Sequence, residues 1–263
     1  MSERYKFQIV KKMKRGVLNY LIIAAILVLP ALISCSKEKV QLLDTITYDD
    51  GSYTKYEYDN ENRVTKISRY DKDGNENIGP TQTFFYSGND LVKVALNSDS
   101  DSSFNLSLEF SKSENKIVVA IKNSNSDNVE TASLYLDNDG LPAKYESETA
   151  SDVVTSSMVG TFEFHDGNLT KYSYKQTQDS IETLEGSLNF KYDNMKSPLY
   201  HCKTPRWWWF ILENKSVQNN EIEMSNDNGE KVEYKYEFDS AGYPTKCTIK
   251  NSEGEYVSEF KYK

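Results

Sequence analysis

The sequence has few of the residues on which most enzymes depend. Its 263 residues include two histidines, His165 and His201, and neither stands in a GxSxG, HExxH or glycine-rich phosphate-binding motif. Aspartate and glutamate are so numerous that no pair stands out as the acid and base of a glycosidase. We therefore predict no enzymatic activity and no cofactor, and a surface glycan hydrolase is the least favoured alternative.

An excess of positive charge is also lacking. The chain has 31 Lys and Arg against 40 Asp and Glu, which gives a formal net charge of −9 at pH 7. A surface with this balance repels polyanions, and nucleic acid is therefore excluded as a partner.

Cysteine is scarce as well, with three residues in the chain. If the protein is exported, Cys202 and Cys247 can form a disulfide, which would close a loop of about 45 residues and stabilise the fold by about 4 kcal/mol. The alternative is two free thiols buried as small apolar groups. No metal site is predicted, because the calcium-like segment 71–77 has Glu76 where an EF-hand loop requires glycine.

The N-terminus has the features of a bacterial lipoprotein signal peptide. Lys11–Arg15 is basic, Leu21–Leu29 is apolar, and Leu32–Cys35 has the form of a lipobox, in which cleavage precedes a cysteine that carries lipid. We expect residues 1–34 to be the signal peptide and residues 35–41 to be the lipidated Cys35 and its tether.

A retained transmembrane helix is the alternative for this segment. Val17–Ser34 is uncharged but is only just long enough to span a bilayer. Pro30 and the polar residues after Cys35 favour the lipobox. The predicted location is therefore the cell envelope, where the lipid anchors the protein to a membrane. The outer membrane is favoured, with the protein on the periplasmic or the surface face of that membrane.

The rest of the chain is built from one repeated unit, seen most clearly in Tyr53–Ile67. Aromatic and β-branched residues alternate with Lys and Glu on both sides of the polar cluster Asp59–Asn62, which is typical of a β-hairpin. Repeats of about 26 residues are supersecondary units that stack on one another. Large residues before successive turns mark the repeat: Tyr58, Tyr86, Phe110, Leu136, Phe164, Phe190 and Phe238.

The stretch Lys231–Phe238 shows the two faces expected of such strands. Apolar side chains share one face and alternating Lys and Glu share the other. The sequence thus predicts an all-β fold over residues 42–263. We expect a single domain, an antiparallel up-and-down meander of about fourteen to sixteen strands of about seven or eight residues, curled into an open or closed barrel-like sheet.

One insert, near residues 204–214, interrupts this pattern. Thr204 and Pro205 are suited to the N-cap and first position of a short helix. The insert contains an aromatic run: Trp207, Trp208, Trp209 and Phe210. Successive helical residues point about 100° apart, so at least one Trp is expected at the surface or in a groove. The run either plugs the concave side of the sheet or forms a platform on which a glycan stacks.

The hairpins resemble YD repeats, whose pattern is Tyr-x-Tyr-Asp-x-x-Gly-Arg-Leu-Thr-x-Ile. Tyr56–Ile67 departs from it in small ways, and Phe238–Lys246 is looser. With the lipobox and the stretch Ser197–Tyr200 before the insert, the chain resembles a family of bacterial lipoproteins of unknown function with a porin-like fold. This resemblance covers residues 42–263, implies a large curled antiparallel sheet and supplies no catalytic residues.

Together these features predict a lipid-anchored, non-enzymatic binding or scaffold module, with a glycan or an envelope protein as partner. A membrane-spanning β-barrel is the main alternative. Spanning strands need about nine to eleven residues, which is longer than the strands predicted here, and the Lys and Glu faces favour a domain in water.

Overall fold

The computed structural model describes most of the chain after residue 39. The described ranges are 40–75, 79–98, 105–125, 129–150, 155–178, 181–211 and 216–263. Gln41–Lys263 forms one compact unit. The predicted signal peptide and the lipidation site Cys35 lie outside the described residues.

Sixteen β-strands and one short helix make up the described part of the chain. The first eight strands are β1 (Leu43–Tyr48), β2 (Tyr53–Tyr58), β3 (Val64–Tyr70), β4 (Thr81–Ser87), β5 (Asp90–Asn97), β6 (Leu106–Ser113), β7 (Lys116–Asn123) and β8 (Val129–Leu136). The others are β9 (Pro142–Ala150), β10 (Thr155–His165), β11 (Asn168–Gln178), β12 (Ile181–Lys196), β13 (Asn219–Asn226), β14 (Lys231–Phe238), β15 (Pro244–Asn251) and β16 (Gly254–Tyr262). The helix, α2 (Arg206–Ile211), lies between β12 and β13 in sequence. Among the described residues, no helix has the length and apolar character needed to cross a membrane.

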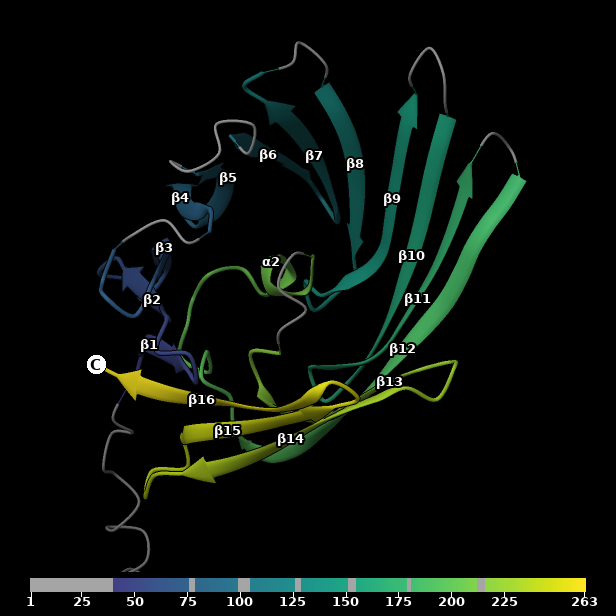
Figure 1. Cartoon of the computed structure of the whole chain (residues 1–263). Helices are drawn as coiled ribbons and strands as arrows, with labels where there is room; N and C mark the ends of the chain where they lie inside the picture. The colour runs from purple at the N-terminus through teal and green to yellow at the C-terminus, as the bar shows by residue number, and fades with distance from the viewer. Residues whose placement is uncertain are drawn as a thin grey trace, which may run out of the picture. The chain divides into compact units, whose positions relative to one another are not determined.

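The strands form one closed antiparallel barrel. Each described strand pairs with its sequence neighbours, and β1 also pairs with β16 (Figure 1). At this seam the Leu42 N–H donates to the Lys263 carbonyl at 3.1 Å, and the Lys263 N–H donates to the Leu42 carbonyl at 3.0 Å. Closure leaves none of these strands with an unpaired edge. The predicted all-β meander is confirmed, and its sheet is closed.

One turn geometry recurs at the hairpin ends and explains the repeat in the sequence. Oδ1 of Asp59 accepts the backbone N–H of Glu61 at 2.9 Å and that of Arg63 at 3.0 Å. Asn62, at the fourth position of the turn, has a φ of 65°, which Asn and Gly tolerate best. Four further turns share this geometry, with Gly at the fourth position; they begin at Asp71, Asp137, Asn226 and Asp239.

Strands β10 to β12 are longer than the sequence pattern predicts. They have 11, 11 and 16 residues, where seven or eight were expected. Polar residues extend them past the apolar core: Ser156 pairs with Gln178 of β11 and with Thr149 of β9. The extended ends of these strands are held by backbone hydrogen bonds to the neighbouring strands. A search for alternating apolar residues does not detect them, because their side chains are polar. Strand length therefore does not separate this part of the barrel from a membrane-spanning one.

Candidate functional site

The aromatic run lies inside the barrel, where α2 is surrounded by strands (Figure 1). Its four side chains are buried, with exposed fractions of 6% for Trp207, 0% for Trp208 and Trp209, and 1% for Phe210. The expectation that at least one Trp faces solvent or a groove is wrong. A helix on a sheet has one covered face, whereas a helix inside a barrel meets wall residues in several directions. Its burial agrees with the plug interpretation, and the run offers no exposed glycan platform.

Aromatic contacts connect the run to separate parts of the wall. The Trp208 ring meets Phe84 of β4 edge-on at a centroid distance of 5.4 Å, and Phe110 of β6 at 5.9 Å. Phe210 meets Phe164 of β10 edge-on at 4.9 Å. Edge-to-face packing is a favourable geometry for aromatic pairs. The helix thereby joins strands that are far apart in the barrel order.

Hydrogen bonds fix the start of the insert helix to the wall. The Val64 N–H on β3 donates to Oγ1 of Thr204 at 2.8 Å. The Tyr86 hydroxyl on β4 lies 2.9 Å from the same oxygen and donates to the Val64 carbonyl at 2.9 Å. Nη2 of Arg206 donates to the Gly167 carbonyl at 2.6 Å. The side chain of the predicted N-cap, Thr204, thus bonds the barrel wall.

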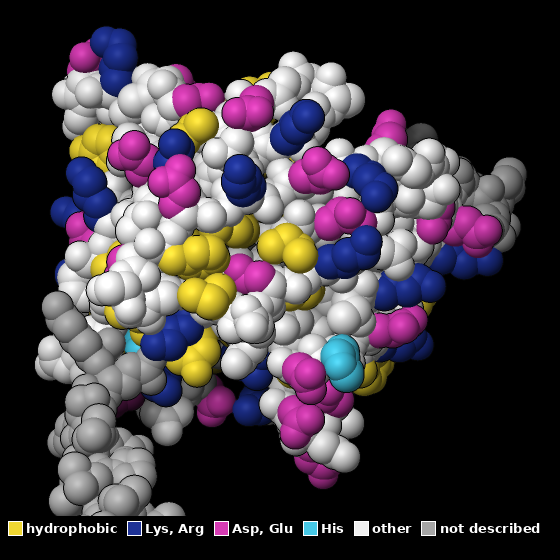
Figure 2. Space-filling model, turned by 90° about the horizontal axis from the view of Figure 1, so that it is seen from below, with side chains coloured by type: hydrophobic (Ala, Val, Ile, Leu, Met, Phe, Trp, Pro, Cys, Tyr) yellow, Lys and Arg dark blue, Asp and Glu magenta, His cyan; other side chains and the backbone are white. Residues whose placement is uncertain are grey.

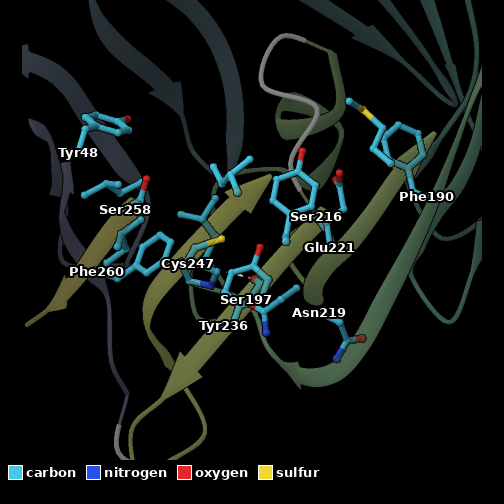
Figure 3. Close-up of a pocket in the computed structure, with 18 of the residues that line it drawn as sticks. Tyr48, Phe190, Ser197, Ser216, Asn219, Glu221, Tyr236, Cys247, Ser258 and Phe260 are labelled. Atoms are coloured by element: carbon cyan, nitrogen blue, oxygen red, sulfur yellow. Dashed lines mark hydrogen bonds between the residues drawn. The ribbon is translucent and has the colours of Figure 1, made fainter. Parts of the chain in front are cut away.

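Another part of the lumen contains a cavity of about 420 Å³. Its wall comes from β12 to β16, from β1 and β2, and from insert residues on both sides of α2 (Figure 3). Most of the lining is apolar and aromatic, and it includes Leu43, Ile46, Phe190, Met224, Ile249 and Phe260. A polar group is formed by Ser216, Asn219, Asn220 and Glu221. A volume of this size with few polar groups is typical of small-molecule sites.

A β-bulge on β13 directs Glu221 toward this cavity. Strict alternation would place Glu221 and Glu223 on the same face. Lys191 of β12 pairs with Glu223, but the next residue, Tyr192, pairs with Glu221, so Ile222 is an extra residue on β13. Ile222 is 38% exposed, whereas Glu221 lines the cavity. Sequence reasoning missed this carboxylate because the bulge depends on the register with β12.

Asp193 of β12 holds the backbone beside the bulge. Its Oδ1 accepts the N–H of Asn220 at 3.1 Å and the N–H of Met195 at 3.0 Å. The same carboxylate accepts Nδ2 of Asn220 at 3.2 Å and 3.0 Å. Because Asn220 is buried, these bonds lie in a protected environment and give the bulge a defined geometry.

Burial controls the electrostatics of the cavity wall. It raises the pKa of Glu221 from 4.5 to about 7, and a hydrogen bond with Tyr234 opposes this rise. Burial also raises the pKa of Tyr234 and of Tyr236, and it raises that of the Cys247 thiol to about 11. Of these four groups, Glu221 is the one that changes its charge near neutral pH.

The two cysteines of the barrel are free thiols, so the possible disulfide between Cys202 and Cys247 is not formed. Cys202 packs against the core around the aromatic run, whereas Cys247 lies in the cavity wall on β15. Burial raises the pKa of both thiols, and neither is activated as a nucleophile.

The histidines do not share a site. His165 is exposed at the last position of β10, with its Nε2 3.3 Å from Oδ2 of Asp166. His201 packs against the rings of Tyr200 and Tyr243, at centroid distances of 5.2 Å and 5.9 Å. In the part of the chain that the structure describes, no group of three or more His, Cys, Asp or Glu residues could hold a metal ion.

The outer face of the barrel carries ion pairs on widely separated strands. Lys122 of β7 is paired with Glu109 of β6. Glu223 of β13 is paired with Lys191 of β12 at 2.8 Å and with Lys231 of β14 at 3.3 Å. Figure 2 shows basic and acidic side chains interspersed on one side of the molecule. This pattern agrees with the alternating Lys and Glu of the sequence.

Comparison with solved structures gives distant similarities. A porin-like protein from Bacteroides vulgatus is 13% identical, with a TM-score of 0.49, over 85% of this chain and 99% of that one. A porin-like protein from Bacteroides uniformis is 11% identical, with a TM-score of 0.36, over 84% of this chain and 96% of that one. No protein-family model and no curated protein matches the chain.

Proposed function

We propose that the chain is a non-enzymatic binding protein of the cell envelope that takes a small molecule into its lumen. The observation that carries this proposal is the cavity of about 420 Å³ beside the insert. Small-molecule sites combine such a volume with an apolar wall and a few placed polar groups, and this cavity has both features. The histidines lie in different surroundings, and burial raises the pKa of both thiols, which favours binding without chemistry.

Entry of a ligand can be tested with the uncharged fluorophore N-phenyl-1-naphthylamine, which brightens in apolar surroundings. We expect saturable binding to the wild-type protein. Ile249→Trp should abolish it, because Ile249 lines the cavity and a larger ring there occupies the space. The matched control is Val118→Trp, at an exposed position on β7. Equal dye binding by both variants would contradict a lumen site.

The same assay tests the glycan hypothesis. Oligosaccharides that displace the fluorophore from the wild-type protein, and fail to bind Ile249→Trp, would identify a glycan as the occupant of the cavity. An envelope protein as partner would instead bind both variants equally, because its surface cannot enter a cavity of this volume.

The second part of the proposal is a lipid anchor on Cys35, favouring the outer membrane and its periplasmic or surface face. It is supported by the lipobox Leu32–Cys35. In cells grown with an alkyne fatty acid, we expect label on the wild-type protein and on Cys202→Ser, and none on Cys35→Ser. Label that persists in Cys35→Ser would refute the anchor.

A membrane-spanning barrel is less well supported. Lipid-facing strands carry a continuous apolar band, whereas ion pairs occupy this outer face at β6–β7 and at β12–β14. We expect residues 36–263, produced without the signal peptide, to remain in solution without detergent. A requirement for detergent, together with heat-sensitive gel mobility, would favour the spanning alternative.

A further inference from the structure

The Glu221 carboxylate is only partly satisfied by the protein. The hydroxyl of Tyr234 bonds it, but Oε1 is buried and has no hydrogen-bond partner among the described residues. A buried acceptor without a donor destabilises the free protein. The ionised carboxylate can accept a donor from outside the protein, and the cavity is where such a donor can approach.

The cavity offers no positive charge to this carboxylate. Among the described residues that line it there is no Lys, Arg or His. The neighbouring wall contributes Tyr234 and Tyr236 from β14 and Cys247 from β15, and Tyr192 of β12 pairs directly with Glu221. Burial keeps these four groups uncharged near pH 7. An ionised Glu221 therefore makes the cavity a site of uncompensated negative charge.

The surfaces around the carboxylate are apolar and aromatic. Figure 3 shows side chains from several strands, among them Phe190, Tyr236 and Phe260, disposed around the same space as Glu221. Aromatic faces attract cations, and apolar walls accept hydrocarbon. A charge-assisted hydrogen bond is also stronger than a neutral one.

We propose that the cavity binds an amphipathic organic cation, whose ammonium group donates to Oε1 of Glu221 while its apolar body packs against the wall near Phe190 and Met224. This inference rests on the proposed function and names the ligand class. An anion of the same shape is repelled by the ionised carboxylate. An alcohol of the same shape makes the hydrogen bond without the charge.

The test compares three ligands of similar shape for their displacement of N-phenyl-1-naphthylamine at pH 8: 4-phenylbutylamine, 4-phenylbutan-1-ol and 5-phenylpentanoate. We expect the amine to bind the wild-type protein about tenfold more tightly than the alcohol, and the anion to bind most weakly. Glu221→Gln should lower the affinity for the amine to about that for the alcohol, which removes the preference. The matched control is Glu223→Gln, two residues away on the outer face. This variant should keep the preference for the amine over the alcohol.

A pH series supplies a second readout that needs no variant. The amine preference of the wild-type protein should grow between pH 6 and pH 8, as Glu221 ionises, while the amine stays cationic. The tyrosines and Cys247 stay uncharged over this range because burial raises their pKa values. A preference that is independent of pH would contradict the role of Glu221.

The outcomes separate this inference from the proposed function. If the fluorophore enters the wild-type protein and not Ile249→Trp, but the amine shows no preference, the lumen binds ligands and the cation inference is wrong. Amine binding is also measured by calorimetry. If neither the fluorophore nor the amine binds, the proposed function and the cation inference are both wrong. If the amine preference survives in Glu221→Gln, the cation inference is wrong and the proposed binding of ligands in the lumen stands.

Discussion

On the side of β3 to β8, the lumen is packed with apolar side chains around Trp208, whereas on the side of β12 to β16 it keeps a cavity and a carboxylate. The same kind of hairpin builds both walls. The insert fills the first part with large rings, and near the second it contributes small or polar groups, such as Ser197 and Ser216. The comparison indicates that the packed half stabilises the barrel and that the open half is available for binding.

The largest effect should come from emptying the packed half. Trp208→Ala removes a fully buried ring from between Phe84 and Phe110 and is expected to lower the free energy of unfolding by about 3–5 kcal/mol. Ile249 is only partly buried and lines the existing cavity, so Ile249→Ala should cost less than a filled core position and lower the free energy of unfolding by about 1–2 kcal/mol. Both free energies of unfolding can be measured by urea denaturation monitored by far-ultraviolet circular dichroism. Equal losses of stability in the two variants would contradict the distinction between a packed and an open half.

The next effect is a pH dependence of stability, and it belongs to the open half. Because the pKa of Glu221 is raised to about 7 in the folded state from 4.5, the folded protein holds a proton that the unfolded chain releases between these values. The free energy of unfolding should therefore fall as the pH rises from about 4.5 to 7, by up to about 3 kcal/mol, and stay level above that window.

Glu221→Gln is the variant that isolates this effect. It should abolish the pH dependence and stabilise the free protein at pH 8 by about 2 kcal/mol, since an amide in this position carries no buried charge. Glu223→Gln on the outer face should do neither. Destabilisation of Glu221→Gln at pH 8 would mean that the carboxylate supports the fold.

A smaller effect is expected where the insert is bonded to the wall. Thr204→Val leaves the buried Val64 N–H without its acceptor at 2.8 Å and should lower the free energy of unfolding by about 1–3 kcal/mol. Tyr86→Phe keeps that bond and should cost about 1 kcal/mol. Thermal unfolding of both variants gives the two losses of stability. A larger loss for Tyr86→Phe than for Thr204→Val would contradict the assigned role of Thr204.

Local features of this barrel could be predicted from the sequence. The turn at Asp59 depends on residues within five positions, so its pattern reveals it, and the same holds for the alternation along Lys231–Phe238. These short-range signals are sufficient to predict an antiparallel meander from the sequence. The sequence does not decide whether the sheet is open or closed, because closure through β1 and β16 depends on contacts between strands at opposite ends of the barrel sequence, which no local pattern reveals.

The plug interpretation of the insert could be reached from its aromatic run, whereas the full burial of that run and the position of Glu221 depend on long-range features. The burial of all three Trp side chains follows from a wall that surrounds α2, and the wall comes from strands distant in sequence. The inward direction of Glu221 follows from a bulge set by pairing with Tyr192. The sequence Glu-Ile-Glu alone places both glutamates on one face. Only the three-dimensional register separates them.

The most direct measurement is the titration of Glu221 by carbon-13 NMR of the side-chain carboxyl groups, in the wild-type protein and in Glu221→Gln. We expect one carboxyl resonance with a midpoint near pH 7, and this resonance should be absent from the variant. In the wild-type protein the midpoint should move to lower pH when 4-phenylbutylamine is added, and it should move less with 4-phenylbutan-1-ol. If every carboxyl group instead titrates below about pH 5.5, as ordinary exposed carboxylates do, Glu221 does not lie in the apolar half of the lumen and the cavity is not the site described here.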